Sequence, residues 1–106
     1  MKRQFISKLS IDPYPGTLNL EIVDPESLQS FNSLKTKKGV EIIPEDPSFC
    51  SAQCHPVLIN GQLKAAIVFP LVKDYPENKM ELIASEKIKE ALFLNTGDLL
   101  EVETLP

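Results

Sequence analysis

Residues 17–23 alternate between polar and apolar side chains, and this two-residue period is typical of a strand with one buried face. The even positions from 18 to 22 are apolar, while Thr17, Asn19 and Glu21 are polar. Other apolar runs, bounded by proline, glycine, asparagine or polar residues, predict further strands. These runs cover residues 40–43, 54–59, 62–69, 80–84 and 99–103. The chain is therefore expected to consist largely of short strands.

The first nine residues predict a short helix, because Phe5, Ile6 and Leu9 fall on one helical face. Asp12-Pro13 is expected to stop this helix, since a residue before proline is disfavoured in the helical region. We expect the helix to lie directly on the strand over residues 17–23.

A second helix is indicated by the sequence that begins at Asp24. The carboxylate of Asp24 can cap the helix and Pro25 suits its first position. Leu28, Phe31 and Leu34 would then form the buried stripe of this helix.

A third helix is expected from residue 86 to about residue 92, with Ser85 as its N-cap. Asn60-Gly61 is a strong hairpin signal, and it joins two of the predicted strands. Within the return strand, the run 65–69 is apolar throughout and is expected to be buried on both faces. Short strands with helical insertions favour a mainly β fold, a small closed barrel with two or three short helices.

Composition narrows the possible functions. A chain of 106 residues with 42% hydrophobic residues is expected to form one domain over residues 1–106. Its net charge of -4, without a basic stripe, argues against nucleic acid as a partner. The sequence KTKK at residues 35–38 is expected to be a solvated loop, with phosphate contact as the alternative. With neither a bilayer-spanning run nor a signal peptide in the pattern, we expect a cytoplasmic protein without a membrane partner.

Candidate chemistry begins with PYPGTLN at residues 13–19. Two prolines and a glycine predict a rigid turn, after which Thr17 and Asn19 stand on the same face of a strand. A hydroxyl and a carboxamide are neutral oxygen donors of the kind Mg²⁺ accepts beside phosphate oxygens. The alternative is a polar strand face in contact with solvent.

This segment resembles the Pro-Tyr-x-Gly-Thr-Leu-Asn motif of the CTP-dependent riboflavin kinases. Further blocks resemble the family in the same order along most of the chain, namely CHPVLING at 54–61, AAIVFP at 65–70, MELIA at 80–84 and LNTGD at 94–98. The resemblance implies a six-stranded cradle-loop barrel. It also implies a kinase that uses CTP and Mg²⁺ to convert riboflavin to FMN, with Thr17 and Asn19 as the metal ligands.

The resemblance also assigns the other candidate site residues. Glu81 would hydrogen-bond the flavin side chain and could act as a base, and Asp74 falls near a position that contacts the flavin in the family. From its residue type alone, the neighbouring Tyr75 could stack on the flavin ring. The segment Glu86, Lys87, Ile88 and Lys89 would bind the nucleotide. The residues alone leave simpler alternatives open: a solvent-facing Glu81, a Tyr75 that only packs in its loop, and a plain helix start at 86–89. Cys50, Cys54 and His55 lack a second ligand pair in the sequence, so no zinc site is expected.

The sequence departs from the family at its start. Family members begin with a strand and a Gly-x-Gly-x-Gly loop that wraps the nucleotide phosphates. Here the pattern begins at the first helix, and the four glycines are isolated from one another. The barrel is thus expected to lack its first strand, which leaves backbone groups unpaired on a neighbouring strand. Three explanations stay open: a start upstream of Met1, a homodimer that pairs the free strand edge, or a non-catalytic flavin- or nucleotide-binding barrel.

Overall fold

The computed structural model describes residues 2–15, 17–43, 51–71 and 75–105, and it shows a mainly β fold with short helices. The strands are β1 (Leu18–Glu21), β2 (Val40–Ile42), β3 (Ala52–Ile59), β4 (Leu63–Pro70), β5 (Lys79–Ala84) and β6 (Val102–Thr104). The helices are α1 (Lys2–Leu9), α2 (Pro25–Lys35) and α3 (Ile88–Ala91). Within the described part of the chain, no helix has the length and apolar character needed to cross a membrane.

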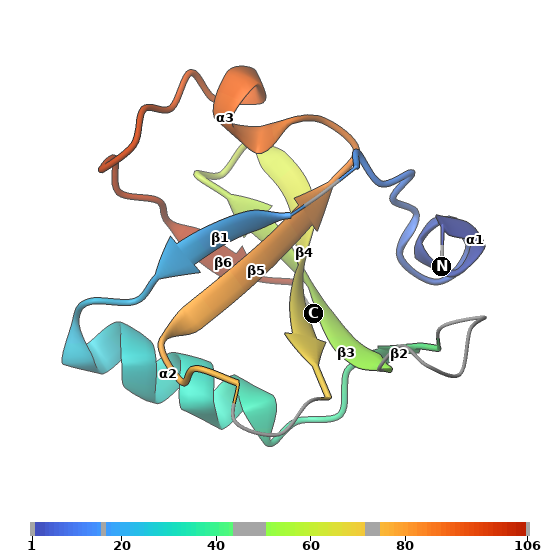
Figure 1. Cartoon of the computed structure of the whole chain (residues 1–106), viewed down its shortest axis with the longest axis horizontal. Helices are drawn as coiled ribbons and strands as arrows, with labels where there is room; N and C mark the ends of the chain where they lie inside the picture. The colour runs from blue at the N-terminus through green and yellow to red at the C-terminus, as the bar shows by residue number, and fades with distance from the viewer. Residues whose placement is uncertain (1, 16, 44–50, 72–74, 106) are drawn as a thin grey trace.

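The strands form one antiparallel sheet in the order β1-β5-β4-β3-β2. The outer edge of β3 pairs with β2 near its start and with β6 near its end. The β3–β4 hairpin turns at Asn60 and Gly61, whose φ angles of 50° and 66° place both in the left-handed region. The sheet curls strongly into a half-barrel (Figure 1). The prediction of a mainly β, six-stranded, barrel-type fold is confirmed.

The two faces of the sheet carry separate apolar clusters, as the two-residue period requires. One cluster contains Val57, Ile67 and Leu82 from the sheet, with Phe31 from α2 and Ile88 from α3. The other cluster is built around Cys54, Ala66 and Ile83 and is covered by α1. Within the predicted buried run 65–69, Ala65, Ala66 and Ile67 are buried, whereas Val68 and Phe69 are only partly buried.

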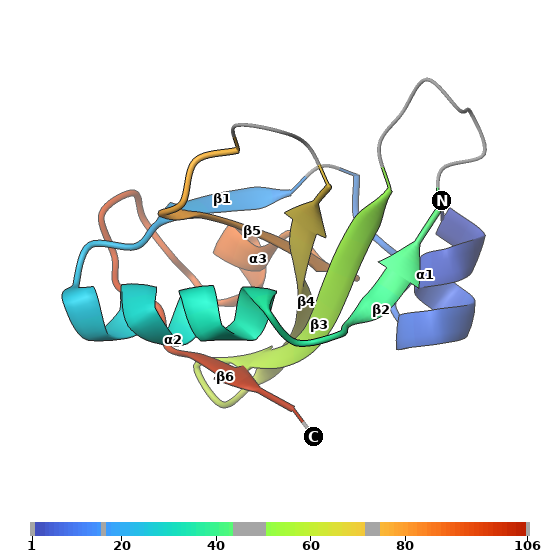
Figure 2. The same ribbon diagram turned by 90° about the horizontal axis from the view of Figure 1, so that it is seen from below.

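Helix α2 begins as the sequence predicts. The Asp24 carboxylate accepts a hydrogen bond from the Ser27 backbone N–H at 2.9 Å, and Pro25 occupies the first turn. Phe31 is buried and contacts Phe69, with 5.0 Å between ring centroids. The helix lies across the opening between β1 and β6 (Figure 2), above a cleft of about 790 Å³ lined by Leu20, Met80 and Val102 among others. In the described residues β1 pairs only with β5, so the other edge of β1 is free.

Helix α1 forms as predicted, but it lies against β2 and not against β1. Gln4 explains this placement, because its side chain exchanges hydrogen bonds with the backbone N–H and carbonyl of Ile43, just beyond β2. The Lys8 ammonium donates to the Glu41 carbonyl at 2.7 Å. Gln4 and Lys8 thus supply hydrogen-bond partners for backbone groups along the edge of β2 that does not pair with β3. Ile6 is correspondingly exposed, contrary to its predicted place on the buried face.

α1 ends at Leu9 as predicted, but the stop lies before Asp12-Pro13, because Ser10 adopts a φ of 57° and the Ile11 N–H bonds to the Phe5 carbonyl. α3 is limited to residues 88–91, without a Ser85 cap, and ends in the same way at Phe93 with a φ of 54°. Both endings are the left-handed helix stop that usually carries glycine. Serine and phenylalanine gave no sequence signal for it.

Candidate active site

Three polar side chains gather on one face of the sheet where β1 and β5 pair. Asn19 and Glu81 stand opposite each other in the strand register. Thr17 precedes β1 on the same face, and its hydroxyl donates a hydrogen bond of 3.2 Å to Glu81 Oε1. Phe5 and Leu9 of α1 cover this face around Ile83, whereas Thr17, Asn19 and Glu81 lie outside that apolar cluster. The alternation of residues 17–21 therefore brings the predicted metal pair beside the predicted flavin-contacting carboxylate.

Tyr75 completes this cluster from the loop before β5. Its phenol donates a hydrogen bond of 2.5 Å to Glu81 Oε2, so both oxygens of that carboxylate accept from a hydroxyl. Burial raises the pKa of Tyr75, and the hydrogen bond and negative charge of Glu81 raise this pKa further. The Lys79 ammonium lies 5.3 Å from the centroid of the Tyr75 ring. The Tyr75 phenol is therefore kept protonated and acts as a donor.

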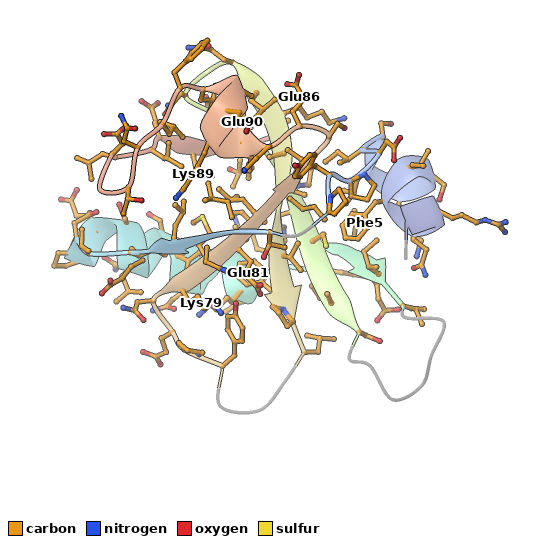
Figure 3. All side chains as sticks on the ribbon, turned by 45° about the horizontal axis from the view of Figure 1, so that its top comes forward. Phe5, Lys79, Glu81, Glu86, Lys89 and Glu90 are labelled. Carbon is orange, nitrogen blue, oxygen red and sulfur yellow. The ribbon has the colours of Figure 1, made fainter. Side chains whose placement is uncertain are left out.

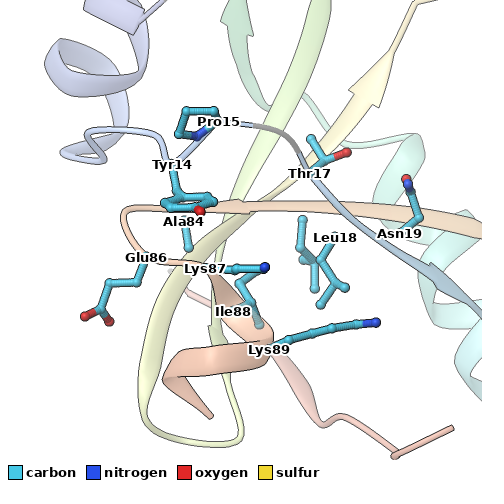
Figure 4. Close-up of a pocket in the computed structure, with 11 residues that line it drawn as sticks. Tyr14, Pro15, Thr17, Leu18, Asn19, Ala84, Glu86, Lys87, Ile88 and Lys89 are labelled. Carbon is cyan, nitrogen blue, oxygen red and sulfur yellow. The ribbon is translucent and has the colours of Figure 1, made fainter. Parts of the chain in front are cut away.

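The residues predicted to bind the nucleotide border a cavity of about 380 Å³ beside β1. The turn before β1 forms one wall through Tyr14 and Pro15, and residues 86–89 form the opposite wall. Thr17 and Asn19 line the cavity at the strand edge. Their side chains nevertheless point to the other side of β1, whereas Leu18 points toward Ile88 and Lys89 (Figure 4). The free edge of β1 thus separates the cavity from the cluster around Glu81.

Two exposed cations stand at the cavity wall. The Lys87 ammonium lies 3.7 Å from the Glu90 carboxylate, and the Lys89 ammonium lies 3.4 Å from the Thr96 hydroxyl. Exposed contacts of this kind contribute little stability, so both ammonium groups can turn toward an anion. Glu86 and Lys89 lie on one side of β1, and Glu81 and Lys79 on the other (Figure 3).

The donor set at β1 fits a hard divalent cation. Thr17 and Asn19 are exposed and present a hydroxyl and an amide oxygen on the same face. Mg²⁺ keeps several water ligands and takes only one or two from protein, with phosphate oxygens as the rest. Because the Thr17 hydroxyl donates a hydrogen bond to Glu81, its oxygen lone pairs remain available to a cation. The described residues contain no group of three or more His, Cys, Asp and Glu suited to a metal.

Cys54 and His55 form no ligand pair in the structure. Cys54 is fully buried, and burial raises the pKa of its thiol to about 12, which disfavours the thiolate form. Consecutive residues of β3 face opposite sides of the sheet, which directs the two side chains apart. Cys50 and Asp74 lie outside the described residues.

Comparison with known proteins identifies the family of the chain. The family model for CTP-dependent riboflavin kinases, described as domain of unknown function DUF120, matches residues 1–104. The chain belongs to this family. The family motif at residues 13–19 supplies Thr17 and Asn19 to the polar cluster, and the MELIA block supplies Glu81. The sequence gave no direct signal for the Tyr75–Glu81 hydrogen bond, because that contact depends on the course of the loop before β5.

Relatives named riboflavin kinase match nearly the whole chain. The protein of Methanocella arvoryzae is 39% identical over 103 residues, which cover 95% of this chain and 45% of that protein. The protein of Archaeoglobus fulgidus is 37% identical over 107 residues, with 98% and 45% covered. The protein of Methanothermobacter thermautotrophicus is 32% identical over 100 residues, with 94% and 78% covered. The chain thus spans less than half of the first two relatives and about three quarters of the third.

Proposed function

We propose that this protein transfers the γ-phosphoryl group of CTP to the ribityl 5′-hydroxyl of riboflavin, giving FMN and CDP in a Mg²⁺-dependent reaction. The observation that carries the proposal is the cluster of Thr17, Asn19 and Glu81 on one face at the β1–β5 edge. The family membership and the names of the relatives support the same chemistry. Phosphoryl transfer depends mainly on positioning and charge neutralisation, which such a cluster can supply.

Thr17 and Asn19 would hold Mg²⁺ through their side-chain oxygens. When bound, the ion neutralises charge on the phosphate oxygens. The hydrogen bond from Thr17 to Glu81 fixes the direction of the threonine hydroxyl, and it links the metal ligands to the residue proposed to meet riboflavin.

Glu81 would orient the attacking ribityl hydroxyl. The ribityl oxygen forms a bond to the γ-phosphorus while the bond to the β,γ-bridging oxygen breaks and CDP leaves. The hydroxyl proton passes to the Glu81 carboxylate. Each carboxylate has about four lone-pair positions, so Glu81 can accept this hydroxyl while it keeps its bonds to Thr17 and Tyr75.

The nucleotide would occupy the cavity between the 13–17 turn and residues 86–89. Lys87 and Lys89 offer positive charge to its phosphates, and Glu86 and Ile88 complete that wall. The choice of CTP over other nucleotides rests on the family name. Flavin contacts from the Tyr75 ring and from Asp74 are part of the same proposal, and Asp74 lies outside the described residues.

The test is FMN formation by the purified chain with riboflavin, Mg²⁺ and either CTP or ATP, followed by chromatography of the flavins. The proposal expects FMN with CTP and Mg²⁺, a much lower rate with ATP, and none without a divalent cation. A folded chain that binds flavin and forms no FMN under any of these conditions would support a non-catalytic flavin-binding barrel instead.

The free edge of β1 supports a second proposal, a homodimer in which strands of two copies pair. An unpaired strand edge presents backbone donors and acceptors that a second strand can satisfy. Analytical ultracentrifugation tests this proposal. A concentration-dependent dimer that is lost on replacement of Glu21 by proline supports it. The Ile22 N–H bonds to the Asn78 carbonyl on the β5 side, so the neighbouring Glu21 N–H faces the free edge, and proline removes this donor. A monomer at all concentrations excludes it.

A further inference from the structure

Glu81 is held at both carboxylate oxygens by hydroxyl groups from two different parts of the chain. Thr17 donates to Oε1 from the turn before β1, and Tyr75 donates to Oε2 from the loop before β5. The Tyr75 contact is the shorter of the two, at 2.5 Å against 3.2 Å. A carboxylate with one donor can rotate about its last bond, whereas two donors on separate elements fix the plane of the group.

Tyr75 is itself held in place by its surroundings. Its side chain is half-buried, and the Lys79 ammonium lies over its ring at 5.3 Å from the centroid. A cation in this position is attracted to the face of the ring. Glu81 is two residues beyond Lys79 on β5, so one short stretch of strand supplies both contacts of the phenol. The phenol therefore cannot move without losing both contacts.

We infer that Tyr75 is a positioning residue, whose hydroxyl fixes the Glu81 carboxylate in the orientation that receives the substrate hydroxyl. This inference rests on the proposed function for its catalytic consequence, although the hydrogen bond can be tested without turnover. It gives Tyr75 a role through its hydroxyl, which is separate from stacking of its ring on the flavin. The two roles predict opposite results for a pair of substitutions.

Tyr75→Phe keeps the ring and removes the hydroxyl, whereas Tyr75→Leu removes both. The inference expects Tyr75→Phe to lower kcat about ten- to hundredfold, as for loss of a hydrogen bond to a charged group, and to leave the KM for CTP unchanged. In a Glu81→Gln background, Tyr75→Phe should lower kcat much less than it does in the wild type, because the two residues act as a unit. A Tyr75→Phe protein that turns over like the wild type, with only Tyr75→Leu impaired, would overturn the inference in favour of ring stacking.

A measurement without turnover separates this inference from the proposed function. The chain has two tyrosines, so Cζ-labelled tyrosine gives two NMR signals, and Tyr14→Phe assigns them. The Tyr75 signal should remain that of a phenol at pH values at which free tyrosine, with a pKa of about 10, is ionised. Glu81→Gln should lower this pKa only in part, since burial is its largest cause.

The outcomes are distinguishable. Titration of Tyr75 near pH 10, with no response to Glu81→Gln, would overturn the hydrogen bond and with it the inference. If the Tyr75 phenol of the wild type stays protonated beyond pH 10 but the chain makes no FMN, the positioning contact is supported and the proposed reaction is rejected. Circular dichroism and thermal unfolding of each variant confirm that losses of rate do not come from unfolding.

Discussion

Asn19 and Glu81 face each other across the β1–β5 pair, and this register joins the proposed metal ligands to the proposed flavin contact. Because side chains alternate between the faces of a strand, a slip of one residue would move Asn19 to the opposite face. Leu18 and Leu20 prevent this slip, since both pack against the apolar cluster on the other face. The packing of two leucines thus sets the geometry of the polar cluster.

Glu81→Gln is expected to lower kcat for FMN formation roughly hundredfold, because glutamine keeps the size of the side chain and cannot take up the substrate proton. The folded structure should persist, since the Gln amide oxygen can accept from one of the two hydroxyls and its NH2 group can donate to the other. Glu41→Gln is the matched control, because Glu41 is an exposed strand carboxylate on β2. Equal rates for Glu81→Gln and Glu41→Gln would contradict the role given to Glu81.

Gly39 is expected to tolerate no side chain. A Cβ at this position would lie 2.6 Å from the Cys54 carbonyl oxygen and 2.9 Å from His55 Nε2. Gly39→Ala should therefore lower the free energy of unfolding by about 1–3 kcal/mol, as for other overpacked sites. Urea denaturation measures the change.

Gly61→Ala serves as the comparison for Gly39→Ala. Gly61 has open space around its missing Cβ and a φ of 66°, so alanine there costs only backbone strain. Gly39→Ala should also shift the NMR signals of the His55 ring, and Gly61→Ala should not. A Gly39→Ala protein as stable as the wild type would show that β2 and β3 are not so closely packed.

Because of His55, the free energy of unfolding is expected to decrease on mild acidification. The ring is buried and Nε2 has no hydrogen-bond partner among the described residues. Burial lowers the pKa of His55, and the charge of Lys37 lowers it further. The unfolded chain binds a proton near pH 6.5 while the folded chain stays neutral to lower pH, so the free energy of unfolding decreases below about pH 6.5.

The chain contains one histidine, so a single NMR titration reports this pKa directly. The urea concentration at the midpoint of unfolding should decrease as the pH is lowered from 7.5 to 5.5. A His55 pKa at or above 6.5, or midpoints that rise on acidification, would contradict the burial of a neutral ring.

The sequence predicted the parts of the fold that depend on local signals. The alternation at residues 17–21, the Asp24 cap and the Asn60-Gly61 turn each specify one conformation, and each is found. The packing of α1 on β2 could not be predicted, because it depends on Gln4 meeting the backbone of a distant residue. The same holds for the candidate site. Pattern and family resemblance identified Glu81, whereas the contact with Tyr75 arises only when the loop folds back onto β5.

The dependence of FMN formation on Mg²⁺ concentration in Asn19→Ala tests the central claim most directly, which is that this face of β1 carries the metal. Glu21→Gln is the control, because Glu21 is exposed on the same face of the same strand, two residues away. We predict that Asn19→Ala raises the Mg²⁺ concentration for half-maximal rate by at least about tenfold, while Glu21→Gln leaves it unchanged. A wild-type Mg²⁺ dependence in a folded Asn19→Ala protein would contradict the account.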